Sequence, residues 1–284
     1  MRLVKVFIVF IFCMNMLSVN AQQPLNVMSF NIRYNNPGDS LNSWQYRKDI
    51  AASQVKFFDA DILGVQEALY DQMLDLQQRL PKYKYEGVGR DDGKTKGEYS
   101  AIFYNTDRLK FLNGSTFWLS EHPGSVGVKG WDAALPRIVT WCAFEDKINH
   151  KKFFAFNTHF DHIGKIARAE SAKLLLGKIK EIAGNNPVVV TGDFNAGDED
   201  EPIKIITDKS NADHLNDSKF ISLQPHYGPD GTFNAFKSKE VSNEAIDHIF
   251  IKNNFKVLKH GTISESWNGR FSSDHFPVFA QISF

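Results

Sequence analysis

The sequence has few cysteines and no apolar run long enough to span a membrane, and each absence excludes a class of protein. Cys13 and Cys142 are its only cysteines. Cys13 lies in an N-terminal apolar segment, so Cys142 has no partner for an intramolecular disulfide once that segment is removed. We expect Cys142 to be a small buried hydrophobe. The apolar segment, Val6 to Met14, is short, because a membrane-spanning helix needs about 20 residues.

This N-terminal segment has the features of a signal peptide. Arg2 and Lys5 precede the apolar stretch, and Val19-Asn20-Ala21 places small residues where a signal peptidase cleaves. We therefore predict a signal peptide over residues 1–21, cleavage after Ala21, and export to the periplasm or the medium. An uncleaved N-terminal membrane anchor is the alternative. Stable insertion of the mature protein in a membrane is not expected.

The sequence also lacks a net charge. It contains 33 basic and 33 acidic residues, and loss of Arg2 and Lys5 with the leader leaves a formal charge of −2. This balance disfavours a non-specific nucleic-acid binder, whose affinity comes from neutralising phosphates, although a local basic rim is compatible with it. No repeat, low-complexity tract or long linker divides the chain, so residues 22–284 are expected to form a single domain and a monomer.

Hydrophobic patterns predict an α/β protein. Helices are expected over residues 44–58, 71–80 and 163–183. The first is amphipathic, and the second is stopped by Pro81. Strands are expected over residues 25–33, 61–65, 83–89, 100–105, 110–119, 138–145, 152–160, 187–191, 245–251 and 277–282. Helices alternate with strands at both ends around a strand-rich middle, which favours two packed sheets flanked by helices.

Polar residues gather where several of these strands end. Gly192-Asp193-Phe194-Asn195-Ala196 follows a buried strand, and Ser273-Asp274-His275-Phe276-Pro277-Val278 places an acid beside an imidazole before the last strand. A rigid scaffold presents such strand-end groups to a cleft. Taken alone, an Asp-X-Asn sequence after a strand is usually only a turn.

Three further segments repeat the pattern. Asn31 and Glu67 end the first two strands, and their amide and carboxylate oxygens suit a hard divalent cation. Asn157-Thr158-His159-Phe160-Asp161-His162 closes another strand. Asp247 and His248 are neighbours in a strand, so they point to opposite faces and at most one faces a given cleft. Together these segments indicate metal-assisted attack on a phosphate ester.

In this order the segments resemble the endonuclease/exonuclease/phosphatase superfamily, which includes deoxyribonucleases, abasic-site endonucleases, sphingomyelinases, inositol-polyphosphate phosphatases and deadenylases. The resemblance covers residues 25–284 and is most specific at Asp193 with Asn195 and at Asp274 with His275. Residues 118–120 and 130–137 are similar to a bacterial group near the deadenylase and nocturnin-like members. The resemblance to the superfamily implies a four-layer α/β/β/α sandwich with the site at one rim of two mixed sheets.

The resemblance also implies the metal site and the group that activates water. Glu67, with Asn31 and Asp274, would hold Mg²⁺, with Mn²⁺ as the other candidate. Asp193 and Asn195 would orient or deprotonate the attacking water. These are the oxygen-rich ligands and the carboxylate base that phosphoryl transfer requires.

It further implies two catalytic histidines. His275 would contact the scissile phosphate while Asp247 holds it, because a carboxylate fixes the tautomer of an imidazole and favours its charged form. His159 would be the second, held by Glu98. The remaining His162 and His248 are expected to be structural.

Three residues are expected to bind substrate. Arg137 begins a strand and could bind phosphate through its planar fork, with a surface ion pair as the alternative. Asn157 belongs to the strand-end cluster, and Trp131 could stack a base or a sugar, as Phe233 could. Packing is the alternative role for such aromatic residues.

The leading hypothesis is therefore a Mg²⁺-dependent phosphodiesterase, a nuclease acting on single-stranded ends, RNA, DNA or small nucleotides. A phosphatase of inositol or sugar phosphates and a sphingomyelinase-like phospholipid phosphodiesterase are the alternatives. An inactive binding module that uses the same cleft is a third class, and the complete set of catalytic residue types argues against it.

Overall fold

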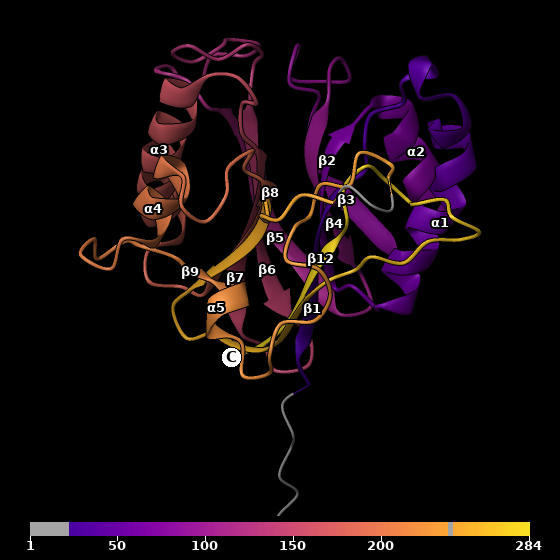
Figure 1. Ribbon diagram of the computed structural model, residues 1–284. Coiled ribbons are helices and arrows are strands. Elements are labelled where there is room, and N and C mark those ends of the chain that lie inside the picture. Colours follow the sequence, from indigo (N-terminus) through magenta and orange to yellow (C-terminus); the bar gives the residue numbers. More distant parts are fainter. Residues whose placement is uncertain (1–22, 238–240) are drawn as a thin grey trace, which may run out of the picture.

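The computed structural model describes residues 23–237 and 241–284, so the predicted signal peptide over residues 1–21 lies outside the described residues. Two mixed six-stranded sheets pack face to face, and helices cover their outer faces (Figure 1). Helices α1 (Trp44–Phe57) and α2 (Tyr70–Arg79) lie on one side, and α3 (Lys165–Ala183) and α4 (Glu201–Thr207) on the other. The four-layer α/β/β/α architecture predicted from the sequence is confirmed.

The first sheet has the order β11-β12-β1-β2-β4-β3. Its strands are β1 (Leu25–Asn31), β2 (Ile62–Ala68), β3 (Tyr83–Glu86), β4 (Tyr99–Asn105), β11 (Lys256–Thr262) and β12 (Val278–Ser283). β1 and β2 are parallel, and the Asn31↔Gln66 register brings Asn31 beside Glu67 at one edge. Two polar residues that are far apart in the sequence therefore lie side by side in the fold.

The second sheet has the order β5-β6-β7-β8-β10-β9. Its strands are β5 (Leu109–Trp118), β6 (Ile138–Asp146), β7 (Lys152–His159), β8 (Val188–Asp193), β9 (Asn216–Asp217) and β10 (Asp247–Lys252). Asp193 is paired with His159 on one side and with Asp247 on the other. Three predicted catalytic residues therefore lie in one row.

Alternating side chains divide the apolar core into three layers. Phe144, Phe153 and Val189 belong to the layer between the sheets. Leu63 and its neighbours pack under α1 and α2, whereas Val190, next to Val189, packs in the layer that contains residues of α3 and α4. Because successive strand residues face opposite sides, each inner strand contributes to two of these layers.

Near the site the sheets also meet through polar groups. The Asn157 amide donates to the carbonyls of Val65 and Ala101 across the interface, at 2.8 and 2.9 Å. At Gly64 an added Cβ would lie 2.1 Å from Thr191 Oγ1. Only a glycine lets β2 approach the opposite sheet this closely.

Four short or polar elements were absent from the sequence prediction: β9, β11, α4 and α5 (Ser218–Ile221), as was a 3₁₀ segment at Pro37–Asn42. β11 is an edge strand with a register shift between Val257 and Lys259, which breaks the alternation that identifies strands. α3 begins later than predicted because the Asp161 carboxylate accepts from the main-chain N–H groups of Ile163 and Gly164. Within the described residues, no helix has the length and apolar character needed to cross a membrane.

Candidate active site

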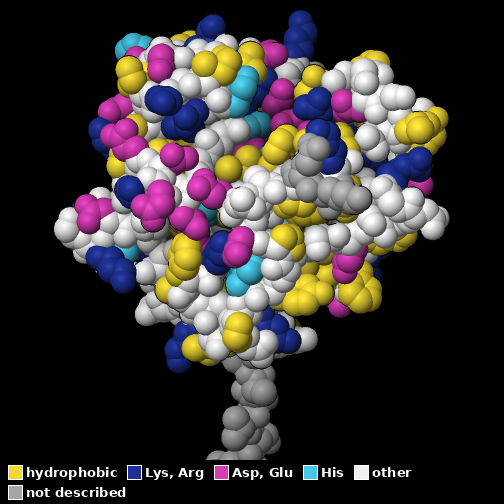
Figure 2. Space-filling model, viewed as in Figure 1, with side chains coloured by type: hydrophobic (Ala, Val, Ile, Leu, Met, Phe, Trp, Pro, Cys, Tyr) yellow, Lys and Arg dark blue, Asp and Glu magenta, His cyan; other side chains and the backbone are white. Residues whose placement is uncertain are grey.

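A cavity of about 640 Å³ opens where the strand ends of the two sheets meet. Figure 2 shows histidine and acidic side chains gathered in a recess between the two halves of the molecule. Eight of the residues predicted from the sequence line this cavity: Glu67, Glu98, Arg137, His159, Asp193, Asn195, Asp274 and His275. Residues far apart in the sequence thus form one site.

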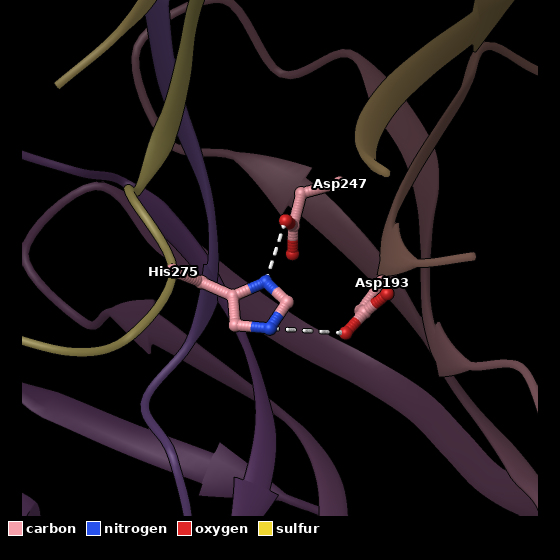
Figure 3. A group of neighbouring side chains, drawn as sticks. All are labelled: Asp193, Asp247 and His275. Atoms are coloured by element: carbon pink, nitrogen blue, oxygen red, sulfur yellow. Dashed lines mark hydrogen bonds and ion pairs between the residues drawn. The ribbon is translucent and has the colours of Figure 1, made fainter. Parts of the chain in front are cut away.

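His275 lies between two buried carboxylates (Figure 3). Its Nδ1 is 2.8 Å from Asp247 Oδ2, and its Nε2 is 3.8 Å from Asp193 Oδ2. Burial opposes a charge on His275, but Asp247 and Asp193 outweigh it and raise the pKa of His275 well above its usual value. The side chain is therefore an imidazolium, able to donate to a phosphate oxygen.

Asp193, at the end of β8, is a buried carboxylate on the cavity wall. Its two oxygens accept from Asn31 Nδ2 at 2.8 Å and from the Asn195 main-chain N–H at 2.9 Å. Burial, with a further contribution from the charge of Asp247, raises the pKa of Asp193 to about 7. A base is most effective when its pKa lies near the working pH.

Asn195 fixes the protonation of His159. Asn195 Nδ2 donates to the Phe160 carbonyl at 3.0 Å, so the same NH₂ group faces His159 Nε2 at 3.1 Å and that nitrogen must accept. Burial, followed by the positive charges of Arg137 and Arg90, lowers the pKa of His159 well below its usual value. His159 is therefore neutral, with its proton on Nδ1.

That proton points toward Glu98, whose Oε2 lies 4.0 Å from His159 Nδ1. Glu98 is held mainly by Arg90, which makes two hydrogen bonds to its carboxylate at 2.6 and 2.9 Å. Burial raises the pKa of Glu98 despite this positive partner. Glu98 and His159 are thus close together, as predicted, but they make no direct hydrogen bond.

On the other side of the cavity, Glu67 and Asp274 converge. Glu67 accepts from Asn31 Nδ2 at 3.0 Å and from the Tyr34 main-chain N–H at 3.1 Å. Arg33 lies between the two acids, with nitrogens 3.9 Å from Glu67 and 3.7 Å from Asp274. Burial is the main reason that the pKa of Asp274 is raised, and the charge of Glu67 adds to it.

Carboxylate oxygens such as these are the donors that a hard divalent cation prefers, and in this structure the positive charge beside them is that of Arg33. Asn31 makes hydrogen bonds through both ends of its amide group. Its oxygen accepts from the Arg33 N–H at 3.0 Å, and its NH₂ group faces Glu67 and Asp193. In this arrangement Asn31 connects Glu67 to Asp193, and its role as a metal ligand stays a prediction.

Two other groups of side chains converge closely enough to hold a cation: Asp193 with Asp247 and His275, and Asp198 with Asp217 and His248. Each contains a histidine already engaged by an acid. In the second group both ring nitrogens of His248 are used, by Asp217 Oδ2 at 2.7 Å and by the Ala196 carbonyl at 3.1 Å. Ion pairing accounts for this second group without a metal.

Arg137 is buried, with 3% of its surface exposed, so the alternative of a surface ion pair is wrong. Its Nε donates to Asp161 at 3.3 Å and its Nη2 to His162 Nδ1 at 2.9 Å. Arginine has only donors, hence this His162 nitrogen accepts. His162, expected to be structural, lines the cavity; its adjacency to Asp161 in the strand-end cluster was the available signal.

The structure does not bring Asn157 or Trp131 to the cavity wall. Asn157 is fully buried, and its oxygen accepts from Gln66 Nε2 and Thr191 Oγ1 while its NH₂ group crosses between the sheets. A substrate contact would require breaking these bonds. Trp131 donates its main-chain N–H to Glu121 in a loop outside the cavity.

Besides His162, five wall residues lie outside the predicted site set: Arg33, Tyr34, Leu135, Phe233 and Ile246. The Phe233 ring packs edge-on against His275, with centroids 5.1 Å apart, and was considered from the sequence only as a stacking residue. Arg33 and Tyr34 follow Asn31 and gave no separate signal, because their direction depends on the chain reversal after β1.

Comparisons with known proteins identify the family to which this fold and this site belong. The model of the Endonuclease/Exonuclease/phosphatase family matches residues 28–275, and the chain belongs to this family. A Bacteroides vulgatus family member is 44% identical, with a TM-score of 0.87 over 92% of this chain and 99% of that one. A mannosyl-6-phosphatase of Bacteroides thetaiotaomicron VPI-5482 is 41% identical, with a TM-score of 0.86 over 92% and 100%.

The catalytic domain of human nocturnin with a bound sulfate anion shares the fold. It is 21% identical, with a TM-score of 0.71 over 92% of this chain and 94% of that domain. The family inferred from the sequence is confirmed, and bacterial proteins are among its members that resemble this chain. The likeness to nocturnin is one of fold.

Proposed function

We propose that this chain is a divalent-metal-dependent phosphatase that hydrolyses the phosphate ester of a small phosphorylated sugar. Hydrolysis of phosphate esters follows from the family and from the site. The observation that carries the finer proposal is the 41% identity, over the whole of that chain, with a protein described as a mannosyl-6-phosphatase. The cavity, about 640 Å³ in volume, is within the usual range for a small-molecule site.

The side chains divide the work of the reaction. Asp193 accepts a proton from the attacking water, whose oxygen bonds to phosphorus as the phosphorus–ester oxygen bond breaks, and the departing sugar oxygen takes up a proton from solvent. The His275 imidazolium, kept charged by Asp247, donates to a non-bridging phosphate oxygen. Glu67 and Asp274 would hold Mg²⁺ or Mn²⁺, which when bound neutralises charge on the phosphate.

A phosphodiesterase that acts on nucleotides or nucleic acid is the second candidate. The aromatic residues at the cavity favour it, because Tyr34 and Phe233 both line the wall and every nucleobase can stack on an aromatic ring. The same rings also suit the apolar face of a sugar. Inositol phosphates and phospholipid headgroups would meet the same groups.

A substrate panel tests the proposal. Purified residues 22–284, stripped with chelator and resupplied with Mg²⁺ or Mn²⁺, would be assayed on hexose 6-phosphates, inositol phosphates, bis-p-nitrophenyl phosphate, single-stranded RNA and DNA, and sphingomyelin. The highest kcat/KM is expected on a sugar monoester. A higher value on a diester or a polynucleotide would overturn the proposed substrate class, and no chelator-sensitive turnover of any substrate would favour an inactive binding module.

We also propose that the protein is exported after cleavage at Ala21, on the strength of the N-terminal segment alone. Expression of the full chain, cell fractionation and intact-mass measurement test it. A mature protein beginning at Gln22 in the periplasm or medium is expected, whereas an uncleaved chain in the membrane fraction would establish the anchor instead.

A further inference from the structure

Arg47 is a fully buried cation outside the cavity whose described hydrogen bonds all go to main-chain carbonyls. It lies in α1 and donates to Asn42 through Nε, to Ile32 and Ser272 through Nη1 at 2.7 and 2.8 Å, and to Arg33 through Nη2 at 3.3 Å. One guanidinium thus joins three chain segments. A buried charge needs such partners, because unpaired it would be strongly destabilising.

The segment that contains Ile32 and Arg33 fixes the position of the Glu67 carboxylate. Ile32 and Arg33, whose carbonyls bind Arg47, lie between Asn31 and Tyr34. Asn31 Nδ2 and the Tyr34 N–H are the two donors that fix the Glu67 carboxylate, at 3.0 and 3.1 Å. A displacement of this segment therefore moves both donors of Glu67 together.

The second segment carries Asp274. Ser272 lies two residues before it, and the Ser273 hydroxyl donates to the Asn31 carbonyl at 2.7 Å. Nη1 of Arg47 bonds to Ser272 and to Ile32 at once. Nη1 of Arg47 and the Ser273 hydroxyl thus both link the segment that holds Glu67 to the segment that carries Asp274.

The guanidinium itself is fixed in place. Its central carbon lies 5.4 Å from the ring centroid of Trp44 and 5.3 Å from that of Phe236. Aromatic faces attract a cation, and the planar fork of arginine loses little further freedom when it bonds to several acceptors. A lysine has three donors on a flexible stem and lacks this shape.

We propose that Arg47 is a positioning residue that holds the two metal-binding carboxylates, Glu67 and Asp274, at the separation a divalent cation requires. This rests on the assignment of those two acids in the proposed function. Residues that orient metal ligands without touching the metal commonly change affinity by 10–100-fold when replaced, about one to two orders of magnitude. Arg47 would act through main-chain carbonyls, at two segments together.

The test compares two buried arginines at opposite ends of β1. Arg47→Met and Arg47→Lys are made beside Arg108→Met as the matched control. Arg108 is also buried, but it bonds to Asp146 at 2.8 and 2.9 Å and to the Gln23 carbonyl, before β1 begins. Mn²⁺ binding is measured without substrate by electron paramagnetic resonance, and unfolding by urea is measured with chelator present.

Arg47→Met is expected to raise the Kd for Mn²⁺ about tenfold or more, with Arg47→Lys intermediate. Arg108→Met should lose stability in urea yet keep the wild-type Kd within about twofold. A folded Arg47→Met or Arg47→Lys protein with the wild-type Kd would overturn the proposal, as would an equal rise in Arg108→Met.

Glu67→Gln separates this proposal from the proposed function. A wild-type Mn²⁺ site that is lost in Glu67→Gln supports the ligand assignment whatever the substrate proves to be. Unchanged binding in Glu67→Gln would remove the assignment and the role of Arg47 with it. A negative substrate panel, by contrast, would leave these binding results unaffected.

Discussion

Several residues around the cavity have a left-handed backbone conformation, which residues other than glycine rarely adopt. Arg33, Glu67 and Asn195 have φ values of 55°, 61° and 48°. Each such residue costs about 1–3 kcal/mol unless its surroundings compensate. Here the compensation is visible, because each side chain is held by hydrogen bonds that the turn in the backbone makes reachable.

At the same scale, Asp193 should be indispensable. Asp193→Asn keeps the size of the side chain but removes the base, and a general base typically contributes about 10²–10⁴-fold to the rate. We expect kcat to fall by at least that factor with circular dichroism unchanged. Asp208→Asn, on an exposed turn, is the matched control and should keep full activity. Retention of more than a tenth of the activity in Asp193→Asn would exclude its role, given the usual contribution of about 10² or more.

Asp247 and His275 should act as a unit, because they lie 2.8 Å apart and Asp247 keeps His275 charged. Asp247→Ala, His275→Ala and the double variant are expected to have similar kcat/KM, since a shared contribution is lost only once. The double-mutant cycle at saturating metal measures this. Losses that multiply in the double variant would show that the two residues work independently.

Ten of the twelve described strands were predicted from the sequence, but the direction of individual side chains at the strand ends was not. Alternation placed Asp247 and His248 on opposite faces, and they bond to His275 and to Asp217 respectively. Glu67 lies where the register of β2 against β4 shifts between Val65 and Ala68. A bulge re-aims the side chains after it, and nothing in the local sequence announces one.

The same reasoning explains why Asn157, predicted to bind substrate, does not line the cavity. Asn157 comes from a strand end rich in polar groups, which predicts exposure to the cleft. Its side chain instead crosses to the other sheet, a contact that only the packing of the two sheets creates. Arg33 was overlooked for the converse reason, since only the chain reversal after β1 carries it back to Glu67 and Asp274.

The closest approach of β2 to the opposite sheet gives a prediction at the scale of elements. Gly64→Ala would place a methyl group 2.1 Å from Thr191 Oγ1 and 2.5 Å from Asn157 Oδ1. Overpacking of this kind costs about 1–3 kcal/mol, and we expect a loss in that range together with reduced activity. Urea unfolding measures it.

Gly177→Ala is the control, because an added Cβ on this α3 glycine has no other heavy atom within 4 Å, its neighbouring residues and the helix's own backbone aside. It should stabilise the protein by about 0.5–1 kcal/mol through helix propensity. Equal effects of the two substitutions would contradict the view that the sheets are tightly apposed at β2.

At the scale of the whole molecule, stability should depend on pH through the buried pair of His248 and Asp217. Burial opposes both charges, but their mutual hydrogen bond and attraction raise the pKa of His248 above 6.5 and lower that of Asp217 below 3.8. The His248 contribution is complete below pH 6.5 and is lost as pH rises through its folded pKa. The Asp217 contribution is complete above pH 3.8 and is lost as pH falls through its folded pKa.

The difference in unfolding free energy between the wild type and His248→Gln should therefore be largest between about pH 4 and 6.5. Breaking a buried pair costs about 3–5 kcal/mol, so a difference of that order is expected at pH 6, shrinking toward pH 9. Urea unfolding across this range measures it. His150→Gln, at an exposed pair with Glu145, should show almost none, and a constant difference for His248→Gln would be evidence against the ion pair.

The place of β12 in the first sheet has a consequence for the order of events during synthesis. β12 is made long after β1, yet it pairs with β1 on one side and with β11 on the other. Although folding of a nascent chain usually starts from its N-terminal part, β1 keeps this edge unpaired until β12 has been translated. Asp274 and His275 arrive in the same interval. A chain released before these residues are made would lack two residues of the candidate site and would leave β1 open along an aggregation-prone edge.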